Sequence, residues 1–244
     1  MVARPGRPAF YAPASGGRLA DVVTLLHPPY TLWHVSYYAL GAAVAPHVHV
    51  DRLLWGLAAF ALAVGVAAHA LDELHDRPLH TSFSDRALRA MAAVSLLGAV
   101  AIGVGGILTV SAWLTPLVLA GGLLVPAYNL ELGSGRFHGD LWFALGWGAF
   151  PAFTGYFVNA LDVSLAAVLI TAGCMAMSVA QRRLSSAARE LRRRTARVDG
   201  VRERTDGSSE ELSVGGLLGP LDGALAVLSL TVPLLAAALL AARL

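Results

Sequence analysis

The chain has 244 residues, of which 56% are hydrophobic and 14% charged, with a formal net charge of +2 and a mean hydropathy of +0.62. Soluble domains carry about 25% charged residues, so this composition excludes a soluble globular protein, and its apolar content excludes a disordered one. The single cysteine, Cys174, excludes a disulfide framework. Continuous apolar stretches without two-residue alternation predict membrane-spanning helices and exclude a β-barrel.

Seven apolar stretches approach the length of about 20 residues that a helix needs to cross about 30 Å of hydrocarbon. They cover residues 30–48, 53–71, 90–110, 113–130, 141–158, 162–180 and 221–242. The third and fourth stretches divide near Ser111, where Trp113 is expected at a membrane interface. The predicted fold class is therefore all-α, a polytopic helical membrane protein with about seven transmembrane helices.

The chain divides into four predicted segments: a cytoplasmic segment 1–29, a six-span core 30–180, a basic segment 181–220 and a C-terminal membrane helix 221–244. The first segment lacks the apolar stretch and cleavage site of a signal peptide. Residues 181–198 place apolar side chains on one helical face and arginines on the others. This pattern predicts an amphipathic helix that lies on the inner leaflet and binds anionic membrane lipids.

Arginine placement predicts the orientation. All 18 basic residues are arginines, and with the N-terminus in the cytoplasm 16 of them lie inside, whereas Arg52 and Arg243 lie outside. This asymmetry follows the positive-inside rule. The lack of lysine and the heavy use of Ala, Gly, Leu and Val indicate a GC-rich bacterial source. We therefore expect a multi-pass protein of the cell (inner) membrane, with a cytoplasmic N-terminus and an external C-terminus.

The second predicted span ends in a cluster of polar residues. His69, Asp72, Glu73 and Asp76 follow the spacing i, i+3, i+4 and i+7. They share one face if the helix continues to Arg77, which precedes a proline. Three neighbouring carboxylates require a positive charge to compensate them. Either Mg²⁺ supplies it, since this ion prefers a few carboxylates together with phosphate oxygens, or nearby arginines do.

Further polar residues are expected on the same membrane face. They are Tyr128, Asn129, Glu131, Arg136, His138 and Asp140, together with the arginines that follow Gln181. Carboxylates, glycine-rich backbone and arginines above an apolar bundle predict a phosphate-binding mouth over a hydrophobic cavity. Such a mouth suits an amphiphile with an anionic head and an apolar tail.

Three stretches of the chain resemble the UbiA-type intramembrane prenyltransferases. Residues 27–43 are similar to the opening helix of that family. Asp72-x-x-x-Asp76, followed by Arg77-Pro78-Leu79, is similar to its first aspartate-rich motif with an Arg-Pro-Leu run. Residues 127–158 are similar to its tyrosine-containing loop, its glycine-rich fifth helix and the Gly-Tyr-Tyr-Val-like close, here Gly155-Tyr156-Phe157-Val158.

The resemblance implies a UbiA-like bundle that binds a polyprenyl diphosphate through Mg²⁺ at the cytoplasmic face. The prenyl group would pass to a hydrophobic acceptor, or be ionised as in a terpene cyclase. Asp72 and Asp76 are then the expected catalytic residues and metal ligands. The expected substrate-binding residues are His69, Glu73, Arg77, Tyr128, Asn129, Arg136, Arg182 and Arg189.

The chain differs from the family in two respects. The family usually has nine spans, and its second aspartate-rich motif is replaced here by the arginine-rich stretch 181–189. Arg182 and Arg189 could instead clamp a diphosphate through bidentate hydrogen bonds. These differences keep a second interpretation open, a non-catalytic scaffold or lipid-binding subunit.

The sequence also bears on other partners and functions. A homo-oligomer or a partner subunit would supply the missing helices. A transporter is disfavoured, because the middle of the spans carries almost no charge. The arginine run lies next to the membrane, so no nucleic-acid partner is expected.

Overall fold

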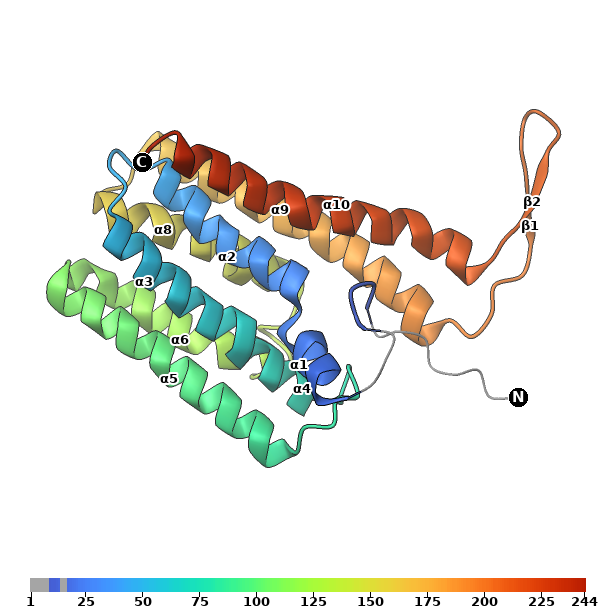
Figure 1. Ribbon diagram of the computed structural model, residues 1–244, viewed down its shortest axis with the longest axis horizontal. Helices are drawn as coiled ribbons and strands as arrows, with labels where there is room; N and C mark the ends of the chain where they lie inside the picture. Colours follow the sequence, from blue (N-terminus) through green and yellow to red (C-terminus); the bar gives the residue numbers. More distant parts are fainter. Residues whose placement is uncertain (1–8, 14–16) are drawn as a thin grey trace.

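The computed structural model describes residues 9–13 and 17–244, and within them it is a bundle of long helices with one short β-hairpin (Figure 1). Arg4 and Arg7, which were counted as internal arginines, lie outside the described residues. In chain order the elements are α1 (Arg18–Leu26), α2 (Pro28–Ala43), α3 (Val50–Phe60), η1 (Ala61–Ala68), α4 (His69–Leu74), α5 (Asp85–Thr109), η2 (Ala112–Leu114), α6 (Thr115–Asn129), α7 (Asp140–Phe143), η3 (Ala144–Ala149), α8 (Phe150–Ala160), α9 (Leu165–Arg189), η4 (Glu190–Arg194), β1 (Val201–Glu203), β2 (Ser209–Glu211) and α10 (Val214–Ala241).

Six helices of the described chain are long and apolar enough to cross a membrane: Val50–Leu74, Asp85–Thr109, Ala112–Asn129, Asp140–Ala160, Leu165–Arg194 and Val214–Ala241. This confirms an all-α, multi-pass membrane class. The remaining predicted span corresponds to α2, whose 16 residues extend about 24 Å at about 1.5 Å per residue. The chain also breaks near Ser111, as predicted, because Ser111 adopts an extended conformation and its hydroxyl accepts a hydrogen bond from the Trp113 amide.

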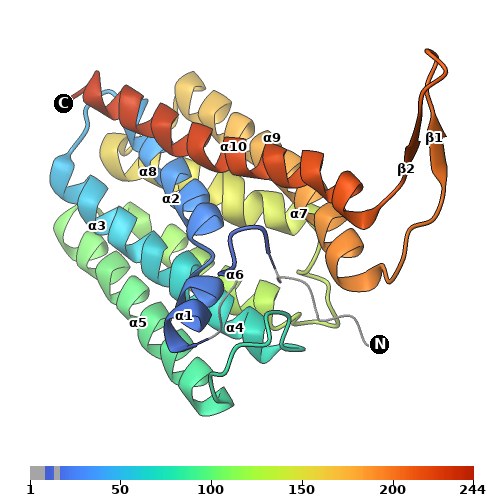
Figure 2. The same cartoon turned by 45° about the vertical axis from the view of Figure 1, so that its right-hand side comes forward.

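Helix α2 lies in the middle of the bundle and packs mainly against α8 and α10 (Figures 1 and 2). Glycines allow this close approach. A Cβ atom at Gly41 would lie 1.9 Å from the Ala152 carbonyl oxygen, and one at Gly155 would lie 2.0 Å from the Tyr38 carbonyl oxygen. The backbones of α2 and α8 are therefore in contact, as small residues permit between membrane helices.

The structure corrects the prediction of an interfacial helix over 181–198. Helix α9 continues the sixth span to Arg189, and the π-helical turn η4 extends it to Arg194. Neither proline nor glycine interrupts residues 174–199. One face, carrying Ser178, Gln181 and Ser185, is buried, so packing holds this segment in line with the span. The last helix also begins at Val214, seven residues before the predicted start, where the Ser213 hydroxyl accepts from the Gly216 amide.

The helix of the second predicted span does not continue to Arg77, and this moves Asp76. The helix stops at Leu74, after which Asp76 and Arg77 adopt positive φ angles of 63° and 51°. The cause is the fully buried carboxylate of Glu73, which accepts hydrogen bonds from the amides of Leu79 and Thr81. These bonds turn the chain back over the helix end. The expectation that Asp76 continues the helical face of Asp72 is therefore wrong.

The bundle has two polar ends. One end, here called the arginine-rich end, contains α1 and residues 75–84, 130–139 and 190–213. The other, here called the opposite end, contains residues 44–49, 110–114, 161–164 and 242–244. Arg52 and Arg243 both lie there, where they donate to the carbonyls of Val158 and Ala45. The β1–β2 hairpin projects from the arginine-rich end, away from the helices (Figure 2).

Candidate functional site

Helices α4, α6 and α9 bring polar side chains together at the arginine-rich end. Asp72 from α4 is half-buried, and the positive charges of Arg189 and Arg193 act on it. Tyr128 ends α6 and lies within the electrostatic range of Arg182, Arg189 and Asp72. The sequence predicted Asp72, Tyr128, Arg182 and Arg189 as site residues. The fold brings these four into one electrostatic neighbourhood.

The Tyr128 hydroxyl has unused hydrogen-bonding capacity. Its ring is 6% exposed and packs between His138 and Trp147, with ring centroids 4.6 and 4.4 Å away. The buried hydroxyl oxygen has no hydrogen-bond partner among the described residues. Buried polar groups are normally paired, so this orphan hydroxyl indicates a place for a polar ligand atom.

Two further polar groups at this end lack partners within residues 9–13 and 17–244. They are the Tyr11 hydroxyl and the amide oxygen of Gln181, which is 3% exposed. Burial raises the pKa of Tyr11 well above its ordinary value, and Tyr30 adds to this, while Arg193 and Arg192 act in the opposite direction. Tyr11 therefore stays protonated and available as a donor.

The arginines of α9 differ in how they are engaged. The Arg182 Nε donates to Asp140 at 3.1 Å, and its guanidinium lies 5.2 Å from the centre of the Phe143 ring. The half-buried Arg189 donates to Ser186 of its own helix at 3.0 Å. The charge of Asp72 also acts on Arg189, but no carboxylate of the described residues forms an ion pair with its guanidinium, so Arg189 retains N–H donors for an anion. Arg192, by contrast, forms a 2.6 Å ion pair with Asp222 that ties η4 to α10.

A pair of histidines, His27 and His69, lies in this region. The rings of His27 and His69 lie 4.3 Å apart. Each Nδ1 donates to a backbone carbonyl, of Leu25 and Gly65 respectively, because a carbonyl can only accept. Burial lowers the pKa of His27 below 6.5, with His69 contributing in the same direction. His27 is therefore neutral at neutral pH.

The other predicted site residues have structural partners or lie apart. Glu73 accepts from the Leu79 amide and from both the amide and the hydroxyl of Thr81. Arg77 donates to the Phe83 carbonyl and to Asp85, which closes the 75–84 loop. The side chain of Asn129 donates to the Val125 carbonyl of its own helix. Asp76 and Arg136 are exposed.

The two predicted aspartates are not arranged along one helical face, as the expected motif requires. Within the described residues no group of three or more His, Cys, Asp or Glu side chains is arranged to hold a metal ion. Asp76 has left the helical face of Asp72, and the cations near Asp72 are arginines. Of the two predicted aspartates, Asp72 is the one on which these arginines act.

Sequence reasoning did not identify His27, Tyr11 and Gln181 as site residues. Tyr11 and His27 lie before the first membrane helix, and no local pattern shows that the chain folds back over the bundle end. Gln181 did leave a signal. Gln181, Ser185 and Arg189 are spaced i, i+4 and i+8, which places them on one face of a helix, and a polar stripe on a membrane helix marks a functional face.

No family model, curated protein or solved structure matches the chain. The function must therefore be argued from the site itself.

Proposed function

We propose that the protein binds a polyprenyl diphosphate at the arginine-rich end and acts on it as a prenyltransferase-like membrane enzyme. The observation that carries this proposal is the buried hydroxyl of Tyr128, which has no hydrogen-bond partner among the described residues and on which the charges of Arg182 and Arg189 act. A diphosphate offers many acceptor oxygens and several negative charges. It would accept hydrogen bonds from Tyr128 and Tyr11 and balance the charge of Arg189, since guanidinium groups bind phosphates through paired N–H donors.

The proposed reaction breaks the bond between the first prenyl carbon and the diphosphate oxygen. The diphosphate leaves with the electron pair. A hydrophobic acceptor then captures the allylic cation; in a cyclase, the prenyl chain of the substrate captures it instead. Arginines that stabilise the growing negative charge of the leaving group would lower the barrier. Mg²⁺ would assist the departure, bound by Asp72 and the diphosphate's own oxygens, as this ion usually keeps few protein ligands.

The predicted orientation fits this proposal. With the arginine-rich end in the cytoplasm, the site faces the compartment into which a soluble pyrophosphate product is released. Exposed arginines such as Arg183 and Arg194 then contact anionic lipids. The protein would then be a multi-pass protein of the cell membrane, with Arg243 on the external side. A second copy or a partner subunit would complete the bundle.

A lipid-binding or scaffold subunit with the same headgroup site is the second candidate. It is favoured by the position of Asp76, which does not continue the helical face of Asp72 as the resemblance implied. In that case the protein holds the isoprenoid diphosphate without ionising it.

One experiment separates the two candidates. The purified chain in detergent is incubated with geranylgeranyl diphosphate, with and without Mg²⁺, while binding and pyrophosphate release are both measured. We expect Asp72→Asn to abolish release, and Asp76→Asn, the matched exposed control, to retain it. Binding without release by the folded protein would establish the subunit. Absence of binding would refute both candidates.

A further inference from the structure

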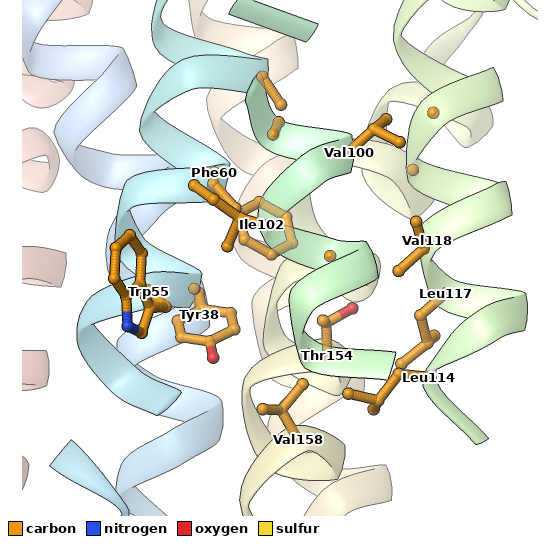
Figure 3. Close-up of a pocket in the computed structure, with 18 of the residues that line it drawn as sticks. Tyr38, Trp55, Phe60, Val100, Ile102, Leu114, Leu117, Val118, Thr154 and Val158 are labelled. Carbon is orange, nitrogen blue, oxygen red and sulfur yellow. The ribbon is translucent and has the colours of Figure 1, made fainter. Parts of the chain in front are cut away.

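An apolar cavity lies between the α5–α6 pair and the helices α3 and α8, away from the arginine-rich end (Figure 3). Its volume is about 550 Å³, within the range of about 300–1,000 Å³ of small-molecule sites. It extends from Asp51 and Arg52 at the opposite end to Val64 and Trp147 in the middle of the bundle. Trp147 separates this cavity from Tyr128 and the arginine-rich end.

The wall of the cavity favours an uncharged ligand. Of the described residues that line it, the charged ones are Asp51 and Arg52, both at its outer mouth. Arg52 already donates to the Val158 carbonyl at 2.9 Å. A charged group placed deeper would lose its hydration without gaining a counter-charge, which is costly within a membrane.

One polar atom inside this cavity has no partner. Thr154 of α8 lines the wall (Figure 3), and its hydroxyl is buried without a hydrogen bond to any described residue. A threonine in a helix commonly donates to a carbonyl one turn earlier, but Thr154 makes no such bond within the described chain. Leaving a buried hydroxyl unpaired is unfavourable. A single ligand oxygen would remove that cost.

The backbone on one side of the cavity leaves space for a ligand. Gly146 is buried in the π-helical segment η3, yet a Cβ atom there would meet no atom within 4 Å. Its neighbour Gly148 differs, since a Cβ atom there would lie 2.6 Å from the Ser178 hydroxyl. The free space beside Gly146 is the cavity itself. The π-helical segments η1 and η3 both contribute to its wall, and such segments are frequent at functional sites.

We propose that this cavity is a separate binding site for an uncharged, long-chain molecule that carries one hydroxyl or carbonyl oxygen. The chain lies along α3, α5 and α6, and the oxygen bonds to Thr154. This site goes beyond the proposed function, because its ligand does not reach the arginine-rich end.

Photolabelling tests this site in the full chain, reconstituted in phosphatidylcholine vesicles. The probe is hexadecanol that carries a diazirine, and labelled peptides are mapped by mass spectrometry, with unlabelled hexadecanol as competitor. We expect competable labelling of α5 and α8. Palmitic acid with the same diazirine should label them at least tenfold less, because its carboxylate is charged. Equal labelling by the acid and the alcohol would overturn the proposal.

Three variants locate the ligand. Gly146→Leu fills the cavity and should abolish competable labelling, whereas Gly173→Leu, on an exposed face of α9 with free space around it, should leave it unchanged. Thr154→Val keeps the shape and should weaken labelling by the alcohol roughly two- to tenfold, the loss of one hydrogen bond. Undiminished labelling of Gly146→Leu would contradict the proposal.

The same Gly146→Leu protein distinguishes this site from the proposed diphosphate site. It should bind geranylgeranyl diphosphate as the wild type does, since that ligand is assigned to the arginine-rich end. If its binding of geranylgeranyl diphosphate falls together with the photolabelling, the cavity holds the tail of the diphosphate and is not a separate site. If wild-type protein binds no diphosphate but is labelled as expected, the proposed function fails and the cavity site stands.

Discussion

The two polar ends of the bundle use their hydrogen-bonding groups differently. At the opposite end the polar groups have partners. The Tyr156 hydroxyl donates to Ser164 at 2.7 Å and lies 3.0 Å from Asp162, and the Asn159 amide oxygen accepts from the His49 backbone amide at 2.8 Å. At the arginine-rich end the buried hydroxyls of Tyr11 and Tyr128 have no partner among the described residues. Polar residues at the first end therefore fasten loops, while those at the second retain capacity for a ligand.

The largest effect is expected at Glu73, which is structural although it lies at the arginine-rich end. Glu73→Ala leaves the buried amides of Leu79 and Thr81 without acceptors, which should lower the free energy of unfolding by about 2–5 kcal/mol. Thermal unfolding in detergent measures this loss. Glu73→Gln keeps one acceptor oxygen and should lose less. A Glu73→Ala protein as stable as wild type would contradict the assignment.

Arg189 should show the reverse behaviour. Arg189→Gln removes the charge that faces the diphosphate and should weaken binding of geranylgeranyl diphosphate roughly ten- to a hundredfold, the value of charged hydrogen bonds. Its melting temperature should change little, because its bond to Ser186 lies within one helix. Arg183→Gln, on the exposed face of the same helix, is the control and should bind normally. Equal losses in both variants would indicate non-specific attraction.

The pH dependence of stability tests the environment of His27. The pKa of His27 is lowered by burial and by His69. Below about pH 6.5 the unfolded chain therefore binds a proton at this histidine, whereas the folded state does not. Stability is thus fully present above that pH and falls as the pH decreases, by up to about 1.4 kcal/mol per pH unit. Denaturation at a series of pH values measures the slope.

A matched pair of histidine variants isolates this contribution. His27→Asn, which tolerates the left-handed backbone at that position, should reduce the slope between pH 6.5 and lower values. His47→Asn, at an exposed position of the opposite end, should retain it. Retention of the slope in both would show that other groups produce it.

The smallest effects compare one tyrosine from each end. Tyr128→Phe removes a hydroxyl without a partner in the described chain, so stability should be unchanged while diphosphate binding weakens roughly two- to tenfold. Tyr156→Phe removes a hydroxyl bonded to Asp162 and Ser164. It should cost about 1 kcal/mol of stability and leave binding intact. Isothermal titration calorimetry with the diphosphate and thermal unfolding are measured for both variants. Loss of stability in Tyr128→Phe, or loss of binding in Tyr156→Phe, would contradict the prediction.

Much of the helical architecture could be predicted, because long apolar stretches in a membrane leave the backbone few alternatives to a helix. Predicted and observed bounds agree within about five residues for the first five spans. The sixth and seventh differ more, since burial of Gln181 and capping by Ser213 depend on neighbouring elements. The site was predictable in part. Asp72, Tyr128, Arg182 and Arg189 come together, but the spacing that grouped Asp76 with Asp72 presumed a helix that Glu73 ends.

The sequence by itself determined that this is a multi-pass helical protein with its arginines gathered at one end, because hydropathy and charge act through composition and order along the chain. The tertiary structure alone decided which polar groups are already satisfied. It engaged Glu73, Arg77 and Arg192 in holding the fold, and it left Tyr128 and Thr154 buried without partners in the described chain. Hydrogen-bond saturation depends on contacts between residues distant in sequence, which no local pattern encodes.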